Sequence, residues 1–274
     1  MKRIIIFIFT ALIAFSLSEC GSGTLNIEMA YVQGGVLQMG KCGDGECSFP
    51  YGNTDYVRTE TVASFNIGRY LVTQLQYKTI MGYNPSYYTV SSEGNSDNLP
   101  VENITWFDAA EFCNKLSIKE GLIPVYTLTN KKDAGDHIYL ADVEINLNNN
   151  GYRLPTEAEW EFAAKGGILA AAGYHGVNTN YYIFSGSNNV DDVAWYRGSG
   201  STHEVGKKAP NELGLYDMSG NVQEWCWDPY ENVRVLRGGS FFNRASNVRS
   251  AYRSAYNQRG HHNFNGFRLV RSCN

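Results

Sequence analysis

The cysteines have the most versatile chemistry in this 274-residue chain, because a thiolate can form a disulfide, ligate a soft metal or act as a nucleophile. There are six of them, too few for a disulfide scaffold in a chain of this length. Cys42 and Cys47 are separated by Gly-Asp-Gly-Glu, a spacing that could close a small disulfide loop. No His or further Cys lies near them in the sequence, so a disulfide is favoured over a metal site.

Arginine is concentrated at the carboxyl end. From Val233 onward there are eight arginines and no Asp, Glu or Lys, although the whole chain has a net charge of -4. A nucleic-acid surface would normally mix Lys with Arg, and the overall charge gives no attraction to nucleic acid. We therefore expect no nucleic-acid partner, and we predict that several of these arginines pair with acids of the core.

Two further motifs have surroundings that do not support their usual chemistry. Gly238-Gly239-Ser240 lacks both the dinucleotide-binding pattern and the P-loop lysine, so it predicts a tight backbone turn rather than a phosphate site. Adjacent His261 and His262 could ligate a metal, but their segment offers no carboxylate to complete a site. We interpret the two histidines as ligand contacts.

Capping chemistry predicts where helices begin. Thr73 with Gln76 and Thr156 with Glu159 have the spacing of a capping box, and Gly82 suits a left-handed helix end. Thr105 precedes apolar residues that recur at helical spacing before Gly121, with positions Trp106, Ala109, Ala110, Cys113 and Leu116. Three short helices are therefore expected.

Strand signals are shorter, and they complete the expected fold class. Apolar residues alternate over 143–147 and again over 233–236. The composition, with 43% hydrophobic residues, supports a sizeable core, while the Gly-, Asn- and Ser-containing stretch over 166–192 indicates long irregular loops. The pattern predicts one mature α+β domain without alternating βαβ units.

The first residues have the pattern of an export signal. Lys2 and Arg3 precede an apolar or small stretch over 4–17 that is short for a membrane span. Leu-Ser-Glu-Cys at 17–20 resembles a lipobox, which predicts a signal peptide over 1–19, lipidation of Cys20, a tether over 20–28 and a domain over 29–274. The alternative is cleavage near Ser18 and full secretion, with Cys20 as a disulfide partner.

Six ordered motifs resemble the formylglycine-generating enzyme, or sulfatase-modifying factor, family. They are FNIGRYLVT at 65–73, LPVENITW at 99–106, GYRLPTEAEWE at 151–161, GLYDMSGNVQEW at 214–225, RGGS at 237–240 and GFR at 266–268. The resemblance spans roughly 29–270. It implies a C-type-lectin-like fold with long loops, in agreement with the irregular, aromatic-rich sequence.

The resemblance also allows the activity to be tested on the sequence. The enzymes bind copper and oxidise their substrate through two cysteines, three and eight positions after the serine of the Gly-Gly-Ser motif. Asn243 and Val248 occupy those positions here, and neither can act as a thiolate. The related iron-dependent sulfoxide synthases need an additional helical metal-binding domain, for which the chain has no room. We therefore expect no enzyme activity and no required cofactor.

The carboxyl end further resembles the variable region of proteins diversified by retroelements, here about 241–265. In those proteins Gly-Gly-Ser-aromatic, Arg-Ser-Ala-Tyr-Arg and Gly-Phe-Arg stay fixed, and adenines of asparagine codons between them are randomised. Apart from Gln258, the intervening residues are ones that such codons can yield. The predicted ligand contacts are Phe242, Asn243, Arg244, Ser246, Asn247, Ser254, Ala255, Tyr256, Asn257, Arg259, Gly260, His261, His262, Asn263, Phe264 and Asn265.

Tyr, Phe and His give large contact area at low entropic cost, while Asn and Ser give adaptable hydrogen bonds, as in antibody paratopes. The resulting hypothesis is a monomeric, surface-displayed receptor or adhesin, lipid-anchored in the bacterial outer membrane, that binds an unknown protein or cell-surface ligand. The alternatives are a formylglycine-generating type of oxidase and a non-catalytic scaffold subunit of an envelope complex. Burial of Tyr256, His262 and Phe264 would contradict the receptor hypothesis.

The family resemblance implies one possible metal. In the enzymes a calcium ion lies at the loop that corresponds to 217–224, and Asp217 and Glu224 keep carboxylates there. A calcium ion would then be structural. The alternative is that Glu224 pairs with an arginine of the carboxyl-terminal segment.

Overall fold

Three threonines begin three of the helices, as their spacing predicts. The computed structural model describes residues 25–40, 57–90, 94–168 and 182–273. The three residues are Thr73, Thr105 and Thr156, and each forms a capping box. The threonine hydroxyl accepts a hydrogen bond from the backbone N–H three residues later, and the side chain of that later residue accepts one from the threonine N–H. Two of the otherwise unpaired donors of each helix are thereby satisfied.

The helices and strands alternate irregularly along the chain. The helical segments are α1 (Gln74–Met81), α2 (Trp106–Lys119), α3 (Glu157–Ala164), α5 (Val190–Val193) and the 3-10 turn η2 (Ala245–Asn247). The strands are β1 (Met29–Val32), β2 (Gly35–Met39), β3 (Arg58–Val62), β4 (Phe65–Gly68), β5 (Tyr126–Ala134), β6 (His137–Ile145), β7 (Ala194–Trp195), β8 (Ser219–Gly220), β9 (Gln223–Tyr230), β10 (Val233–Arg237), β11 (Arg253–Tyr256), β12 (Asn265–Gly266) and β13 (Val270–Ser272).

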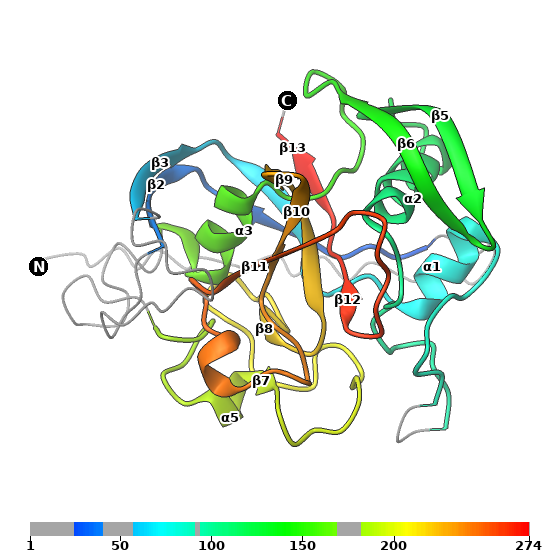
Figure 1. Ribbon diagram of the computed structural model, residues 1–274. Helices are drawn as coiled ribbons and strands as arrows, with labels where there is room; N and C mark the ends of the chain where they lie inside the picture. Colours follow the sequence, from blue (N-terminus) through cyan, green and yellow to red (C-terminus); the bar gives the residue numbers. More distant parts are fainter. Residues whose placement is uncertain (1–24, 41–56, 91–93, 169–181, 274) are drawn as a thin grey trace, which may run out of the picture.

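A four-stranded sheet lies at the centre of the molecule (Figure 1), with strand order β11-β10-β9-β12. Strands β9, β10 and β11 pair antiparallel, whereas β12 joins β9 in parallel. A second sheet has the order β1-β4-β13, so strands from the two ends of the domain share one neighbour. The remaining strands form two-stranded pairs, including the long β5–β6 hairpin.

Alternate residues of the β9–β10 pair enter two different cores. Trp225 and Leu236 pack in a cluster around α2, whereas Cys226 and Val235 pack in a cluster around α3. Successive side chains of a strand point to opposite faces, so both faces of this pair are buried. In Figure 1, α3 with β2 and β3 lies on one side of the central strands, and α1, α2 and the β5–β6 hairpin lie on the other.

The structure also shows what the sequence patterns missed. Of the alternation over 143–147, only 143–145 belong to a strand, the end of β6. Its partner β5 carries mostly exposed residues and gives no apolar alternation. The stretch at 233–236 forms β10 as predicted. Within the described ranges no helix is long and apolar enough to cross a membrane. The predicted signal peptide, the lipidation at Cys20 and the Cys42–Cys47 loop lie outside the described residues.

Candidate functional site

The predicted ligand contacts, except Asn265 of β12, lie on β11 and on two loops that flank it in sequence. The first loop, 240–248, follows β10 and contains η2. The second loop, 257–264, connects β11 to β12, the red segment of Figure 1. We call the accessible surface of β11 and these two loops the C-terminal face.

The first loop begins with the tight turn that the Gly-Gly-Ser motif predicts. Gly238 and Gly239 have φ angles of 85° and 65°, and a Cβ atom on Gly239 would lie 2.3 Å from the carbonyl oxygen of Asn247. Only glycine fits this conformation without strain. The Ser240 hydroxyl and N–H then donate to Asn243 Oδ1 at 2.9 and 2.8 Å, so Asn243 also holds the loop in shape.

The second loop rests on the start of α2 and on β6. The N–H of Trp106 donates to the carbonyl of Gln258, and the N–H of Asn103 donates to that of His262. The guanidinium of Arg259 lies over the ring of Tyr139 at 5.1 Å. These contacts tie the loop to structure that is distant in sequence.

A series of aromatic rings crosses the C-terminal face. Ring centroids are 6.3 Å apart for Phe242 and Phe264, 5.0 Å for Phe264 and His262, and 4.6 Å for His262 and Tyr256. Phe242 is 71% exposed and Tyr256 is 40% exposed, while His262 and Phe264 are half-buried. The burial that would contradict the receptor hypothesis is therefore not found.

The other predicted contacts differ in exposure. Arg244, Ser246, Asn257, Arg259 and His261 are exposed. Asn243, Asn247, Ser254, Ala255, Gly260 and Asn263 are half-buried. Asn265 is fully buried in β12, where it pairs with Gln223 of β9. The prediction that Asn265 contacts a ligand is wrong, because the parallel pairing with β9 turns this position into part of the core.

Several residues at this face were not predicted. Tyr87 is 70% exposed and packs edge-on against Tyr88, whose ring contacts Phe241 and whose hydroxyl accepts from Asn263 Nδ2 at 3.4 Å. The ring of His137 stacks on His261 at 4.2 Å. Two adjacent tyrosines after Pro85 are a sequence signal for an aromatic loop, but nothing local places that loop beside Asn263.

Beneath the face, the carboxyl-terminal arginines pair with acids, as predicted. Both side chains of the Arg268–Glu224 pair are fully buried, with 2.6 Å between Nε and Oε2. Arg237 pairs with Glu161, and Arg253 Nε lies 2.8 Å from Glu157 Oε1. These acids come from α3 and β9, so the ion pairs tie the carboxyl-terminal segment to the core.

The same geometry argues against calcium at Asp217 and Glu224. Glu224 accepts two hydrogen bonds from Arg268 and one from Trp160 Nε1 at 2.8 Å. Asp217 accepts from the N–H of Gly206 and from Asn221, and burial raises the pKa of Asp217 to about 6. A hard cation would have to displace the guanidinium of Arg268. These residues do not fit a calcium ion, and Glu224 follows the alternative prediction of an ion pair.

No thiol among the described residues lies at the C-terminal face. Cys113 and Cys226 are buried in the two cores, and burial raises the pKa of both thiols. Cys273 is exposed and accepts a hydrogen bond from Asn66 of β4. In the described ranges no cluster of three or more His, Cys, Asp or Glu side chains could hold a metal ion. Val248, at one position that is Cys in the enzymes, is fully buried.

Two titratable groups lie at the edge of the face. Burial lowers the pKa of His261, and the neighbouring His137 lowers it further. Glu102 is fully buried behind the Tyr87–Tyr88 loop, and its Oε1 accepts the N–H of Tyr88 at 2.8 Å. Burial raises the pKa of Glu102 to about 8, so this carboxyl holds its proton at neutral pH.

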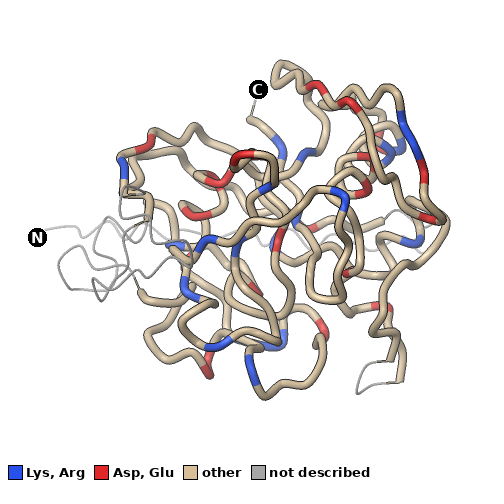
Figure 2. Tube along the Cα trace, viewed as in Figure 1, with Lys and Arg blue, Asp and Glu red and all other residues tan. Residues whose placement is uncertain are grey.

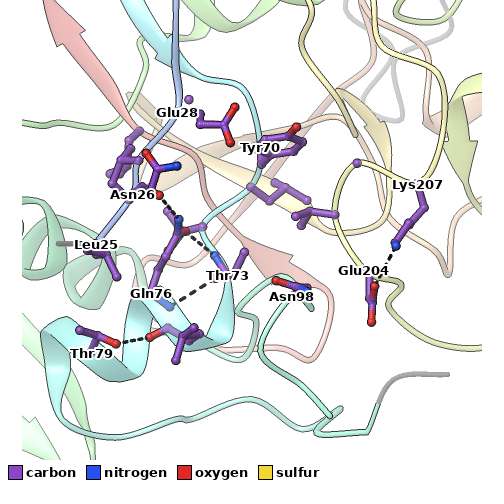
Figure 3. Close-up of a pocket in the computed structure, with 18 residues that line it drawn as sticks. Leu25, Asn26, Glu28, Tyr70, Thr73, Gln76, Thr79, Asn98, Glu204 and Lys207 are labelled. Atoms are coloured by element: carbon purple, nitrogen blue, oxygen red, sulfur yellow. Dashed lines mark hydrogen bonds and ion pairs between the residues drawn. The ribbon is translucent and has the colours of Figure 1, made fainter. Parts of the chain in front are cut away.

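Two open cavities differ in their relation to this face. One of about 600 Å³, which we call the arginine pocket, opens between the first loop and residues 197–200, and its lining includes Arg197, Gly198, Phe242, Asn243, Arg244 and Asn247. The other, of about 620 Å³, lies between residues 25–28, α1 and residues 204–207 (Figure 3). It contains none of the predicted ligand contacts. Predicted contacts line the arginine pocket, and Asn257 and Arg259 line a third cavity of about 480 Å³ between residues 229–234 and the second loop.

Comparisons with known proteins agree with this architecture. The family model of the sulfatase-modifying factor enzyme 1-like domain matches residues 19–273. A protein of Paenibacillus barcinonensis named chaperone protein LppX is 34% identical over 99% of this chain and 100% of its own length. The formylglycine-generating enzyme of Thermomonospora curvata is 30% identical over 78% of this chain and 82% of its own.

Among solved structures, Treponema denticola variable protein 1 superimposes with a TM-score of 0.73 at 32% identity. The match covers 91% of this chain and 96% of that protein. This likeness confirms the predicted α+β, C-type-lectin-like fold and the resemblance to the variable proteins.

Proposed function

The chain belongs to the family of sulfatase-modifying factor enzyme 1-like domains, and on this premise we propose that it binds a ligand through the C-terminal face and catalyses no covalent step. One observation carries the proposal. Above the buried pairs of Arg237 and Arg268, four aromatic rings follow one another across the face, two of them exposed and two half-buried. Exposed rings of this size are expected at a binding surface rather than on an inert one.

The absence of catalysis is supported by residues at the positions where the enzymes carry cysteines. Asn243 accepts hydrogen bonds from Ser240, and Val248 is enclosed by apolar side chains. Neither can bind copper as a thiolate. Incubation of the protein with copper, oxygen and a cysteine-containing peptide should therefore leave the peptide unchanged, whereas aldehyde formation would establish the oxidase.

We further propose that the residues over 241–265 are diversified by a retroelement. The fold similarity to a protein named variable protein supports this assignment, as do the residue types between the fixed motifs. The decisive observation is genomic: a second copy of codons 241–265 that differs at adenines, beside a reverse transcriptase gene. A single copy without such a neighbour would contradict diversification, while ligand binding would remain to be tested separately.

Display at the cell surface completes the proposal. The first twenty residues support export and a lipid anchor on Cys20, and the face requires access to the surroundings of the cell. Metabolic labelling with a clickable fatty acid should label the wild-type chain and spare Cys20→Ser. Protease treatment of intact cells should degrade the protein if it is displayed, and full protection would place it inside the envelope.

Binding itself is tested by changing the aromatic rings of the face and keeping the buried pairs Arg237–Glu161 and Arg268–Glu224, which we call the frame. A variant with Phe242→Ser, Tyr256→Ser and Phe264→Ser should lose the peptides selected from a phage-displayed library on the wild-type protein, with a nearly unchanged melting transition. Tyr31 of β1 is 60% exposed, so Tyr31→Ser is the matched control and should still bind the selected peptides. Equal loss of binding and folding, or retained binding, would contradict the proposal and favour the envelope-scaffold alternative.

A further inference from the structure

Two arginines differ from all the others in the described ranges. Each of the remaining described arginines has a hydrogen bond, ion pair, ring contact or electrostatic interaction, for example Arg237 with Glu161, Arg271 with Tyr152 and Arg69 with Gly214. The guanidinium groups of Arg197 and Arg244 make no hydrogen bond, ion pair or ring contact within those ranges. Both side chains are on exposed residues.

These two arginines line the same cavity, the arginine pocket. Among the residues that the structure describes, no Asp, Glu or Lys lines it, although the chain as a whole is acidic. Figure 2 shows basic positions along the loops beside β7 and the orange η2 turn of Figure 1. Two like charges gathered without a counter-charge form a site of positive potential that attracts an anion.

A backbone hydrogen bond holds the two sides of the pocket together. The N–H of Arg197 donates to the carbonyl of Asn243 at 2.7 Å, which ties the 197–200 segment to the first loop of the C-terminal face. Gly198 and Gly200 follow with φ angles of 111° and 80°, and an added Cβ on either would meet nothing within 4 Å. Both glycines line the pocket, and the space beside them is open.

We propose that the arginine pocket binds a carboxylate of a protein ligand, held between the guanidinium groups of Arg197 and Arg244. This inference rests on the proposed function and specifies its partner as an acidic protein segment. A guanidinium offers parallel N–H donors that match the two oxygens of a carboxylate, and such charge-assisted bonds are stronger than neutral ones. The exposed ring of Phe242 lines the same pocket and provides apolar contact for the residue beside the acid.

A protein is favoured over a charged glycan by the combination of groups at the face. Arginine and large aromatic residues are the side chains that dominate protein–protein interfaces. Here the pocket adjoins the rings of Phe242 and Phe264, which extend the contact beyond a single anionic group. A ligand with an acidic residue flanked by apolar ones would satisfy both parts.

Arg197 stays in the pocket when residues 241–265 change. It lies outside 241–265, so changes in that region leave it in place. Its anchoring hydrogen bond uses the backbone carbonyl of Asn243, which any residue at position 243 would supply. Different versions of the face would therefore share a preference for acidic ligands while differing in their remaining contacts.

The test selects peptides from a phage-displayed random library on wild-type protein and on Arg197→Gln, Arg244→Gln and the double variant. Peptides selected on the wild type should be enriched in Asp and Glu next to apolar residues. Each single variant should bind synthetic copies of these peptides about tenfold more weakly, as loss of one charge-assisted contact predicts. Arg58→Gln removes the same charge from β3, away from this pocket, and should bind as the wild type does.

The outcomes separate this inference from the proposed function. Peptides that bind through Phe242 and Tyr256 but lack acidic residues, with affinities unchanged in Arg197→Gln, would overturn the arginine pocket and leave the binding face intact. Failure to select any peptide dependent on these rings would contradict the proposed function itself. Arginine-dependent binding of sialylated or sulfated glycans on an array, without peptide binding, would overturn the choice of a protein ligand.

Discussion

In the carboxyl-terminal segment, some arginines lie in the interior while some aromatic residues lie at the surface. Arg237 and Arg268 are fully buried and charged, whereas Phe242 and Tyr256, in the same part of the chain, expose aromatic rings to solvent. In most proteins arginine lies outside and phenylalanine inside. The buried pairs fix how this segment attaches to the core, and the exposed rings contribute little to that attachment. Under the proposed function, stability and recognition therefore depend on different residues.

The largest expected effect comes from breaking the buried frame. Arg268→Met leaves Glu224 without its cation in a position with no access to water, which should lower the free energy of unfolding by about 3–5 kcal/mol. Urea denaturation followed by tryptophan fluorescence measures this loss. Arg58→Met removes one partner of an exposed pair and should change stability by less than about 1 kcal/mol. Similar losses in both variants would show that the buried pair does not hold the frame.

The unfolding free energy should depend on pH through Glu102, which lies between the core and the C-terminal face. The pKa of Glu102 is raised from 4.5 to about 8 in the folded protein, so its contribution to stability is fully present below pH 4.5 and is lost as the pH rises through about 8. Wild-type protein should therefore lose more unfolding free energy, on the order of a few kcal/mol, between about pH 5 and about pH 8 than Glu102→Gln does.

Glutamine retains an oxygen that can accept the N–H of Tyr88, so Glu102→Gln removes the ionisation and keeps the hydrogen bond. Comparing the two proteins at each pH also cancels the contribution of Asp217, whose pKa is raised in the same direction. Parallel stability curves would show that Glu102 does not titrate in this range.

A substitution of Asn265 tests whether this residue belongs to the core or to the C-terminal face. It is fully buried, and neither its amide nitrogen nor its amide oxygen has a hydrogen-bond partner in the described part of the chain. Asn265→Leu replaces an unsatisfied amide by an apolar group of similar size and should raise the unfolding free energy by about 1 kcal/mol. Ligand capture should not change. A loss of stability would indicate a bound water or another partner of this amide.

The smallest effect on stability is expected at the face. Phe242→Ala and Tyr256→Ala remove exposed rings and should change the unfolding free energy by no more than about 0.5 kcal/mol. Phe267→Ala removes a fully buried ring of the same carboxyl-terminal segment and should cost about 3–5 kcal/mol. If the face variants are destabilised as much as the core variant, the rings serve folding and the division between frame and face fails.

The sequence predicted those features that depend on neighbouring residues. The capping boxes at Thr73 and Thr156 and the turn at Gly239 follow from the chemistry of a few consecutive positions. The buried arginine pairs could be expected as a class, because the carboxyl-terminal segment has no acids of its own. Their partners could not be named, since Glu161 and Glu224 are brought to Arg237 and Arg268 only by the fold.

The candidate site was predicted less completely for the same reason. Tyr87 and Arg197 lie far from residues 241–265 in sequence, and only tertiary contacts with Phe241 and Asn243 bring their loops to that segment. Asn265 has the residue type of its exposed neighbours, yet its pairing with β9 places it in the interior. Residue type alone does not separate these cases, because burial is decided by the strand that follows the loop.

The sheet of β1, β4 and β13 has a mechanical consequence. Met29 pairs with Gly68 at one end of β4, and Ser272 pairs with Phe65 at the other. Tension applied between the two ends of the domain would pull β1 and β13 in opposite directions along β4. All the hydrogen bonds that join these strands would then bear the load together in shear, instead of opening one after another, which is the arrangement that best resists extension.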